Sequence, residues 1–203
     1  PGQVPMGMIK RQYGEGSFTV LGPTQIRDDS NNNSVVVRLD YGDTSFLFTG
    51  DAESKEEKDI IAANEDLYCD VLSVGHHGSA SSTSWDFLEA VLPEYAVISC
   101  GVNNSYGHPD PDTIEKLESI EAQIFRTDLQ GNIIAISDGE TITWNNVPSN
   151  GEVLYAADFV SVKEEPNDTS STVGELGPGN QIQVLNRDDD GWATIVFNGA
   201  TTY

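Results

Sequence analysis

The sequence predicts an α/β domain followed by a small all-β domain, and three observations lead to this prediction. Residues 16–50 contain apolar runs with the alternation of β-strands, and residues 52–127 alternate helical patterns with short apolar runs. This order is typical of a sheet covered by helices. From about residue 152 the helical patterns stop, and short strands separated by Gly, Asn and Asp clusters follow. The predicted domains are residues 1–146 and 152–203.

The first domain begins with β structure. GSFTVLGP, at 16–23, is expected to be a strand that ends in a Pro-containing turn. SVVVRLDYGDTSFLFTG, at 34–50, contains two alternating runs around Tyr-Gly-Asp, which predicts a hairpin. The later strands are short apolar runs, expected at 70–75, 95–99, 122–127, 131–137 and 140–144.

Three helices are expected between these strands. The first covers about 52–64, with Ser54 and Glu57 at the spacing of a capping box. The second starts at the N-cap Ser84 and is ended by Pro93. The third has Asp110 as its N-cap, followed by a proline at the first helical position.

Composition limits the classes of function. The chain of 203 residues has 33 acidic and 10 basic side chains, for a formal net charge of −23. Nucleic-acid binders neutralise phosphates with Lys and Arg, and this sequence has no such basic footprint. Its apolar runs are much shorter than the about 20 residues of a membrane span. Cys69 precedes one strand and Cys100 ends the next, so a disulfide between them is not expected.

Asp51 and all three histidines follow the ends of predicted strands. Asp51 closes TSFLFTGD, His76 and His77 close DVLSVGHH, and His108 follows YAVISCGVNNSYGH. Ligands of open α/β sheets gather outside the carboxyl ends of the strands, and imidazole and carboxylate are ordinary ligands of first-row metals. The sequence therefore predicts a metal site at one edge of the sheet. The alternative is that Asp51 only caps the following helix.

Polar residues near these histidines are candidates for binding substrate. Ser79 follows the histidine pair, and we interpret it as a loop hydroxyl or a donor that supports the site. Asn104 lies in the loop before His108, where it either contacts substrate or only marks a turn. Asn31 to Asn33 precede the hairpin and line the site or form a flexible loop.

Four stretches between Gly16 and Trp144 together resemble the later half of a metallo-β-lactamase-fold hydrolase domain of the ComEC-type competence proteins. They are NNNSVVVRLDYGDTSFLFTGDAE, DVLSVGHHGS, YAVISCGVNNSYGHPDP and FRTDLQGNI. The resemblance implies an αββα fold with a two-ion site of zinc or manganese. It implies that Asp51 bridges the ions and that a later histidine is a ligand. His108 is the better topological candidate, and His76 or His77 ligates metal or positions substrate.

The sequence departs from the family at one place. The family's signature HxHxDH or HxDxDH, from the earlier half of the domain, is absent from this sequence. We therefore expect residues 1–146 to form a partial domain. The missing half precedes this chain, belongs to a partner, or is not required because the remaining half has another role.

The resemblance implies a metal-dependent hydrolase acting on phosphodiesters, with DNA as the implied substrate class. The charge of −23 argues against strong affinity of this chain alone for DNA. The alternative is a non-catalytic protein of the cell envelope that carries a degenerate half-site.

The tail from Glu152 resembles a bacterial SH3-type domain. VGELGPGNQIQVLNRDDDGWATIVFNG has the family's order of a Gly-bearing turn, a β run and a Gly-Trp before another β run, whereas VSVKEEPND departs from it. The resemblance implies an extracellular or cell-surface location and binding of peptidoglycan or another cell-wall polymer through 152–203. Trp192 either stacks on a ligand or packs into the barrel core.

Overall fold

The computed structural model describes residues 9–64, 66–150, 152–187, 190–197 and 200–203. The chain divides into two compact units, Pro1–Thr143 and Trp144–Tyr203. The first eight residues of the predicted first domain, and positions 188–189 and 198–199 of the predicted second one, lie outside the described residues.

The first unit contains a seven-stranded sheet whose strands follow one another in sequence order. The strands are β1 (Ile9–Tyr13), β2 (Gly16–Gly22), β3 (Val36–Tyr41), β4 (Thr44–Phe48), β5 (Val71–Ser73), β6 (Tyr95–Ile98) and β7 (Gln123–Arg126). Strands β1 to β4 are antiparallel neighbours, whereas β4, β5, β6 and β7 run parallel. The carboxyl ends of the four parallel strands therefore meet at one edge, as predicted from the strand–helix alternation.

The β3–β4 hairpin turns at Gly42. Its φ of +57° lies in the left-handed region, and a Cβ there would stand 2.2 Å from Gly139 O. That carbonyl accepts a hydrogen bond from Asp43 N at 2.6 Å. The contact joins the hairpin turn to a second hairpin, β8 (Ala135–Ser137) with β9 (Ile142–Trp144). Only glycine fits at position 42 because both the backbone angle and the close approach exclude a side chain.

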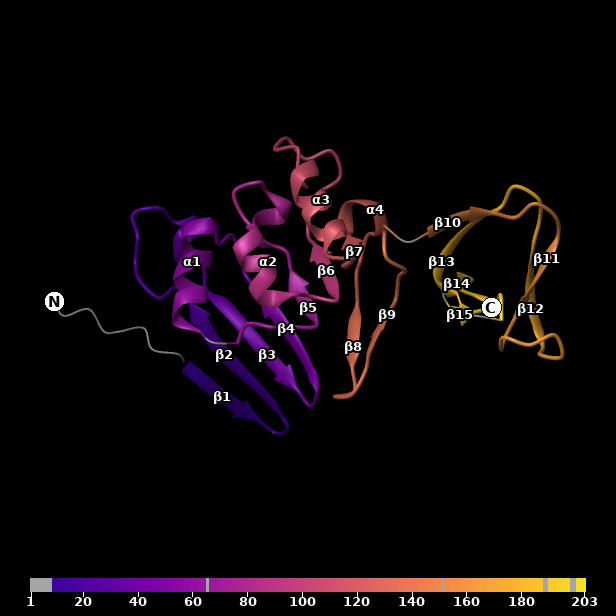
Figure 1. Cartoon of the computed structure of the whole chain (residues 1–203), viewed down its shortest axis with the longest axis horizontal. Coiled ribbons are helices and arrows are strands. Elements are labelled where there is room, and N and C mark those ends of the chain that lie inside the picture. Colours follow the sequence, from indigo (N-terminus) through magenta and orange to yellow (C-terminus); the bar gives the residue numbers. More distant parts are fainter. Residues whose placement is uncertain (1–8, 65, 151, 188–189, 198–199) are drawn as a thin grey trace. The chain divides into compact units, whose positions relative to one another are not determined.

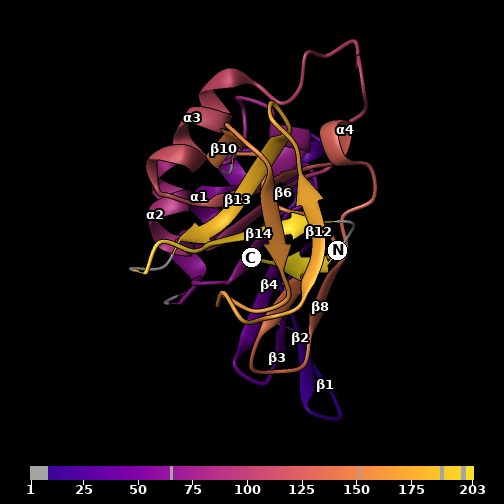
Figure 2. The ribbon, with the colours of Figure 1, turned by 90° about the vertical axis from the view of Figure 1, so that its right-hand side faces the viewer.

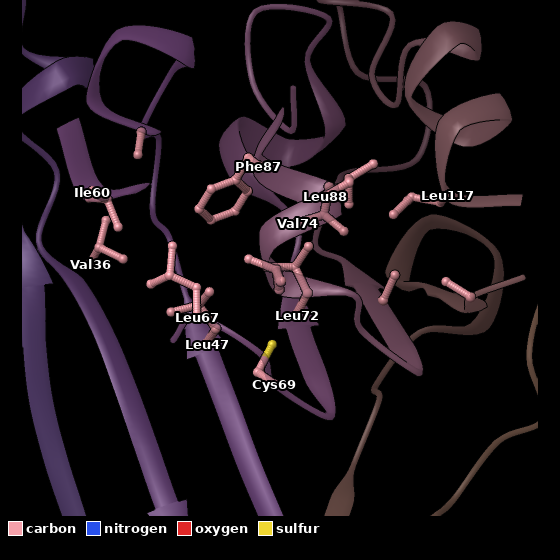
Figure 3. Packing of buried hydrophobic residues seen from close by; sticks show 14 of the residues in the cluster. Val36, Leu47, Ile60, Leu67, Cys69, Leu72, Val74, Phe87, Leu88 and Leu117 are labelled. Carbon is pink, nitrogen blue, oxygen red and sulfur yellow. The ribbon is translucent and has the colours of Figure 1, made fainter. Parts of the chain in front are cut away.

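Three helices lie together on one side of the sheet: α1 (Ser54–Ala63), α2 (Trp85–Val91) and α3 (Pro111–Ser119) (Figures 1 and 2). Apolar side chains from these helices and the strands form the core between them (Figure 3). Its members include Val36, Leu47, Ile60, Leu72, Val74, Phe87, Leu88, Ile98, Leu117 and Ile124. Burial of each large apolar side chain contributes about 1.5–3 kcal/mol, so this layer holds the strand ends in place.

The opposite face of the sheet carries two rows of paired residues that run across the strands. One row runs from Arg11 through Phe18, Leu39, Phe46, Val71 and Tyr95 to Gln123. The other is Val20, Val37, Phe48, Ser73, Val97 and Phe125. Phe18 is 41% exposed and Phe48 is 45% exposed. This face is largely apolar although part of it remains accessible to water. A sheet face in contact with water usually carries polar side chains, so this composition is unusual.

Two helix caps are confirmed and one is wrong. Ser84 Oγ accepts from Phe87 N, and the Asp110 side chain accepts from Asp112 N, as predicted. Helix α1, however, begins at Ser54 after the N-cap Glu53, whose side chain makes no cap bond. Glu57 does not close a capping box, because its buried carboxylate accepts hydrogen bonds from Thr83 N and Ser84 N instead.

Both cysteines are free thiols, as expected. Cys69 is fully buried, and this burial raises the pKa of its thiol to about 12. A thiol that is protonated at physiological pH and shielded from solvent acts as a small apolar group of the core.

The second unit is all β. Its strands are β10 (Glu152–Tyr155), β11 (Val160–Lys163), β12 (Thr172–Leu176), β13 (Gln181–Arg187), β14 (Ala193–Phe197) and β15 (Ala200–Thr202). Strands β10, β13, β14 and β15 form one sheet, and β11 pairs with β12. The small core contains Val162, Val184 and Ile195. Trp192 is half-buried and lines an open hollow of about 470 Å³. The SH3-type barrel and both roles of Trp192 stay predictions.

Within the part of the chain that the structure describes, no helix has the length and apolar character required to cross a membrane.

Candidate functional site

The ends of β4, β5 and β6 bring the four predicted site residues to one edge of the sheet. Two hydrogen bonds tie the first two strand ends together, from Thr49 Oγ1 to Ser73 O at 2.8 Å and from His76 N to Gly50 O at 2.9 Å. The short turn η2 (Gly75–Gly78) then carries both adjacent histidines. Segments far apart in sequence therefore deliver their polar groups to one place, because their strands are parallel neighbours.

His77 is the histidine that contacts Asp51. Its Nε2 lies 3.7 Å from Asp51 Oδ1. Its Nδ1 lies 2.7 Å from Ser99 O. A carbonyl oxygen only accepts, so Nδ1 carries the proton, and in the neutral ring Nε2 then presents a lone pair. A lone pair opposite a carboxylate oxygen is repulsive unless a proton or a metal cation lies between them. The geometry of this pair is suited to holding a cation.

His76 has a different environment, formed by Ser81 and Glu53. Its Nδ1 lies 3.3 Å from Ser81 Oγ and 3.4 Å from Glu53 Oε1. Its ring centroid is 6.4 Å from that of His77 and 5.8 Å from that of His108. The three histidines thus form a contiguous group, in which the His76 ring neighbours both of the others.

The loop after β6 positions His108. The Asn104 side chain accepts from His108 N at 3.0 Å and donates to His108 O at 2.6 Å. Tyr106, which is 82% exposed, stacks on the His108 ring at a centroid distance of 5.9 Å and an interplanar angle of 13°. An open hollow of about 240 Å³ lies between this loop and His77. A small polar group could enter it and meet imidazoles from both segments.

Ser79 and Asn104, the predicted substrate-binding residues, have structural contacts. Ser79 is buried, and its Oγ lies 3.0 Å from Ser81 Oγ, the atom that contacts His76. The Asn104 amide nitrogen donates to Gly101 O as well as to His108 O. Both side chains therefore hold the loops that carry histidines, and their contact with substrate stays a prediction.

The histidine turn has an unfavourable backbone. His76 has φ of 49° and His77 has φ of 58°, both in the left-handed region. Each such residue other than glycine costs about 1–3 kcal/mol and persists only where its surroundings hold it. Strain of this kind is concentrated at functional sites, which agrees with the placement of both imidazoles here.

A chain of hydrogen bonds connects the backbone of Asp51 to Glu56 through Ser34. Asp51 N donates to Ser34 Oγ at 3.1 Å, and Ser34 N donates to Glu56 Oε2 at 3.1 Å. Glu56 is 1% exposed, and this burial raises the pKa of its carboxyl to about 7. Glu56 Oε1 has no hydrogen-bond partner among the described residues. Asp51 itself does not cap α1, whose N-cap is Glu53.

The donors present fit a metal ion in part. Metal–donor bonds to His and Asp are about 2.0–2.2 Å long, so two donors up to roughly 4 Å apart can bind one ion. Asp51 Oδ1 and His77 Nε2 meet this condition. Across the described residues, however, no group of three or more His, Cys, Asp or Glu side chains is arranged to hold a metal. In the half-site expected from the sequence, Asp51 and His77 thus form a donor pair with the spacing that one ion requires.

The role of Glu53 was not predicted from the sequence, and a flexible loop was one of the two alternatives for Asn31–Asn33. Residues Asn31–Asn33 form the short helix η1, and Asn32 is 1% exposed rather than part of a flexible loop. Asn31 and Asn32 donate to the two carboxylate oxygens of Glu53, each at 3.2 Å. The signal available was the place of Glu53 two residues after Asp51, although nothing in the sequence indicated its partners.

Comparison with known proteins shows what the first unit is similar to. Residues 14–102 match the family described as the metallo-beta-lactamase superfamily. The chain is 38% identical to ComE operon protein 3 of Bacillus subtilis over 117 residues, which cover 57% of this chain and 15% of that protein. It is 38% identical to competence protein ComA of Neisseria gonorrhoeae over 122 residues, covering 59% and 18% respectively. It is 39% identical to recombination protein 2 of Haemophilus influenzae over 118 residues, covering 57% and 15%.

These matches support a metallo-beta-lactamase-fold domain of mixed α/β content, and one of the relatives is named as a competence protein. The aligned parts span only 15–18% of the length of these three relatives. The superfamily is typically dependent on divalent metals, and the identity of the metal stays a prediction.

Proposed function

We propose that this chain contributes the Asp51–His77 part of a divalent-metal hydrolase site that acts on phosphodiesters. The observation that carries the proposal is the 3.7 Å approach of His77 Nε2 to Asp51 Oδ1 while Ser99 O holds the proton on Nδ1. An imidazole lone pair beside a carboxylate is the donor arrangement that divalent metals use. The remaining donors are proposed to come from the preceding half of the domain or from a partner chain.

The chain's residues have distinct parts in this proposal. Asp51 and His77 would hold a zinc or manganese ion, Ser99 O orients His77, and Asn104 holds His108 beside the hollow. When bound, such an ion lowers the pKa of water and neutralises charge that develops on a phosphoryl group. The accessible apolar face of the sheet supports the proposal that further structure completes the domain.

The proposed substrate class is a phosphodiester, with DNA as its leading member. Support comes from the relatives, two of which are named for competence and recombination. The net charge of −23 would repel a polyanion, so most of the affinity for DNA is assigned to other parts of a longer protein.

Metal binding by the full-length protein tests the proposal. Zinc and manganese affinities would be measured by isothermal titration calorimetry for the parent protein and for Asp51→Asn and His77→Asn. Asparagine is chosen because it tolerates left-handed backbone at position 77. Loss of a direct ligand should weaken binding by more than the about 10–100-fold seen for outer-shell partners, and hydrolysis of plasmid DNA should fall in parallel.

The matched control is Asp43→Asn, which removes one exposed carboxylate from the turn of the β3–β4 hairpin. If Asp51→Asn and His77→Asn bind both metals as tightly as Asp43→Asn does, the hydrolase proposal fails.

The lack of a three-donor group among the described residues favours a second candidate function. In this proposal the chain is a non-catalytic, cell-surface protein that binds a cell-wall polymer through residues 152–203. Sedimentation with purified peptidoglycan would test it. The expected result is retention of both the parent chain and an Asp51→Asn/His77→Asn variant, without bound metal by elemental analysis. Failure of the parent chain to sediment would reject this candidate.

A further inference from the structure

We propose that Glu53, acting through Ser81, is a positioning residue that keeps the proton of His76 on Nδ1. Nε2 of His76 is then left unprotonated, with its lone pair able to bind a metal or accept a proton. The inference deepens the proposed function and rests on it for its purpose, because an unprotonated imidazole nitrogen is what a metal ligand or a proton acceptor needs. Hydrogen-bond donors and acceptors around His76 match in only one way.

Glu53 lies at the junction of three segments. Glu53 is the N-cap residue of α1, but its side chain makes no capping hydrogen bond. Its carboxylate instead accepts from Asn31 Nδ2 at 3.2 Å, from Asn32 Nδ2 at 3.2 Å and from Ser81 Oγ at 3.0 Å. Every one of these contacts comes from a donor group, so Glu53 acts as an acceptor throughout.

The single hydroxyl proton of Ser81 then decides the state of His76. Ser81 Oγ donates to Glu53 Oε1, so the same oxygen can only accept from its other neighbours. Those neighbours are Ser79 Oγ at 3.0 Å and His76 Nδ1 at 3.3 Å. Nδ1 must therefore carry a proton, and Glu53 Oε1 lies 3.4 Å away as a second acceptor for it. In the neutral ring, Nε2 is left with its lone pair.

The asparagines prevent Glu53 from turning away. Asn32 is 1% exposed and is itself fixed, because its Nδ2 also donates to Asp29 Oδ2 at 2.7 Å and its Oδ1 accepts from Glu56 N at 3.1 Å. Two amides, one of them fixed by its own hydrogen bonds, therefore hold the Glu53 carboxylate in the orientation that faces Ser81. Helix η1 therefore reaches the histidine turn through Glu53, although it makes no direct contact with His76 in the hydrogen bonds described.

The inference separates two histidines that sequence alone left equivalent. The carbonyl of Ser99 keeps the proton of His77 on Nδ1. For His76, the Glu53 carboxylate and the Ser81 hydroxyl keep the proton on the corresponding nitrogen. Both rings are thereby held in the same tautomer. His77 presents its Nε2 to Asp51, and His76 supplies a second free nitrogen in the ring that neighbours His108.

Imidazole tautomers can be read directly by long-range ¹H–¹⁵N NMR of the metal-free chain with a chelator present. The spectra would be recorded near pH 8.5, about two units above the ordinary histidine pKa of about 6.5. The three histidines are assigned with His77→Asn and His108→Asn. In the parent chain, Nδ1 of His76 should show the shift of a protonated nitrogen.

Glu53→Ala frees the Ser81 hydroxyl to donate to His76 Nδ1. We expect the Nδ1–H to Nε2–H ratio of His76 to change by about tenfold toward Nε2–H, corresponding to about 1.4 kcal/mol. Ser81→Ala, at an exposed position, should give a smaller change, because Glu53 remains within reach. His77 should keep its tautomer in both variants. Asp59→Ala, which removes a carboxylate of the same helix, is the control and should leave His76 unchanged.

An unchanged His76 tautomer in both Glu53→Ala and Ser81→Ala would overturn the inference. If Glu53→Ala does not fold, an unchanged tautomer in Ser81→Ala overturns the route through Ser81. This result is independent of the metal-binding test on Asp51 and His77. Retained tautomer control without metal binding would reject the hydrolase proposal only, whereas metal binding with a free His76 tautomer would reject the positioning role only.

Discussion

Replacing Glu56 by glutamine should remove a large part of the pH dependence of stability. Burial raises the pKa of Glu56 from 4.5 to about 7 in the folded chain, so the folded state binds its proton more tightly than the unfolded state does. Stability must then fall as the pH rises from about 4.5 to about 7, because ionisation is easier in the unfolded chain. Each pKa unit is worth about 1.4 kcal/mol, which gives a loss of about 3 kcal/mol across this window.

Glu56→Gln keeps an oxygen that can accept from Ser34 N, but it cannot ionise. The free energy of unfolding would be measured by urea denaturation at pH 4 and pH 8 for the parent chain, for Glu56→Gln and for the exposed control Glu118→Gln. The quantity compared is the free energy of unfolding of Glu56→Gln minus that of the parent chain. This difference should be about 3 kcal/mol larger at pH 8 than at pH 4. Equal pH dependence in Glu56→Gln and Glu118→Gln would refute the reasoning, because other groups cancel in the comparison.

Three further predictions concern the core, a helix cap and the His108 loop. Leu72→Ala removes a fully buried side chain and should cost about 2–5 kcal/mol in urea denaturation, whereas Leu129→Ala at a 63% exposed position should stay within about 0.5 kcal/mol. Asp110→Ala removes the N-cap of α3 and should lower its stability by about 1 kcal/mol, and no loss would contradict the cap. Asn104→Ala removes three hydrogen bonds and should speed proteolytic cleavage within residues 101–107, as followed by mass spectrometry. An unchanged cleavage rate would show that Asn104 does not hold the loop.

The elements that the sequence predicts well are those with local causes. Strands β2, β3 and β4 follow the alternation of apolar residues, and the caps Ser84 and Asp110 act on backbone within three residues of themselves. The convergence of Asp51 with the histidines also follows from local signals, because parallel strands place their ends on one edge.

The details that sequence does not reveal depend on contacts between distant residues. Glu57 has the spacing of a capping box, yet burial against the start of α2 gives it Thr83 N and Ser84 N as better partners. Glu53 meets Ser81 and Asn31 across separations of 28 and 22 residues. Helical spacing and motif content carry no information on such pairs, so the choice between His76 and His77 required coordinates.

The left-handed conformation of His76 and His77 affects how natural or selected variation at these positions should be judged. In a randomised library, glycine and asparagine would be enriched at both positions for conformational reasons alone, before any chemistry is selected. Retention of histidine against that bias would indicate selection for the imidazole side chain itself. Recovery of mostly glycine from an activity-based selection would instead show that the turn, rather than the two side chains, had been preserved.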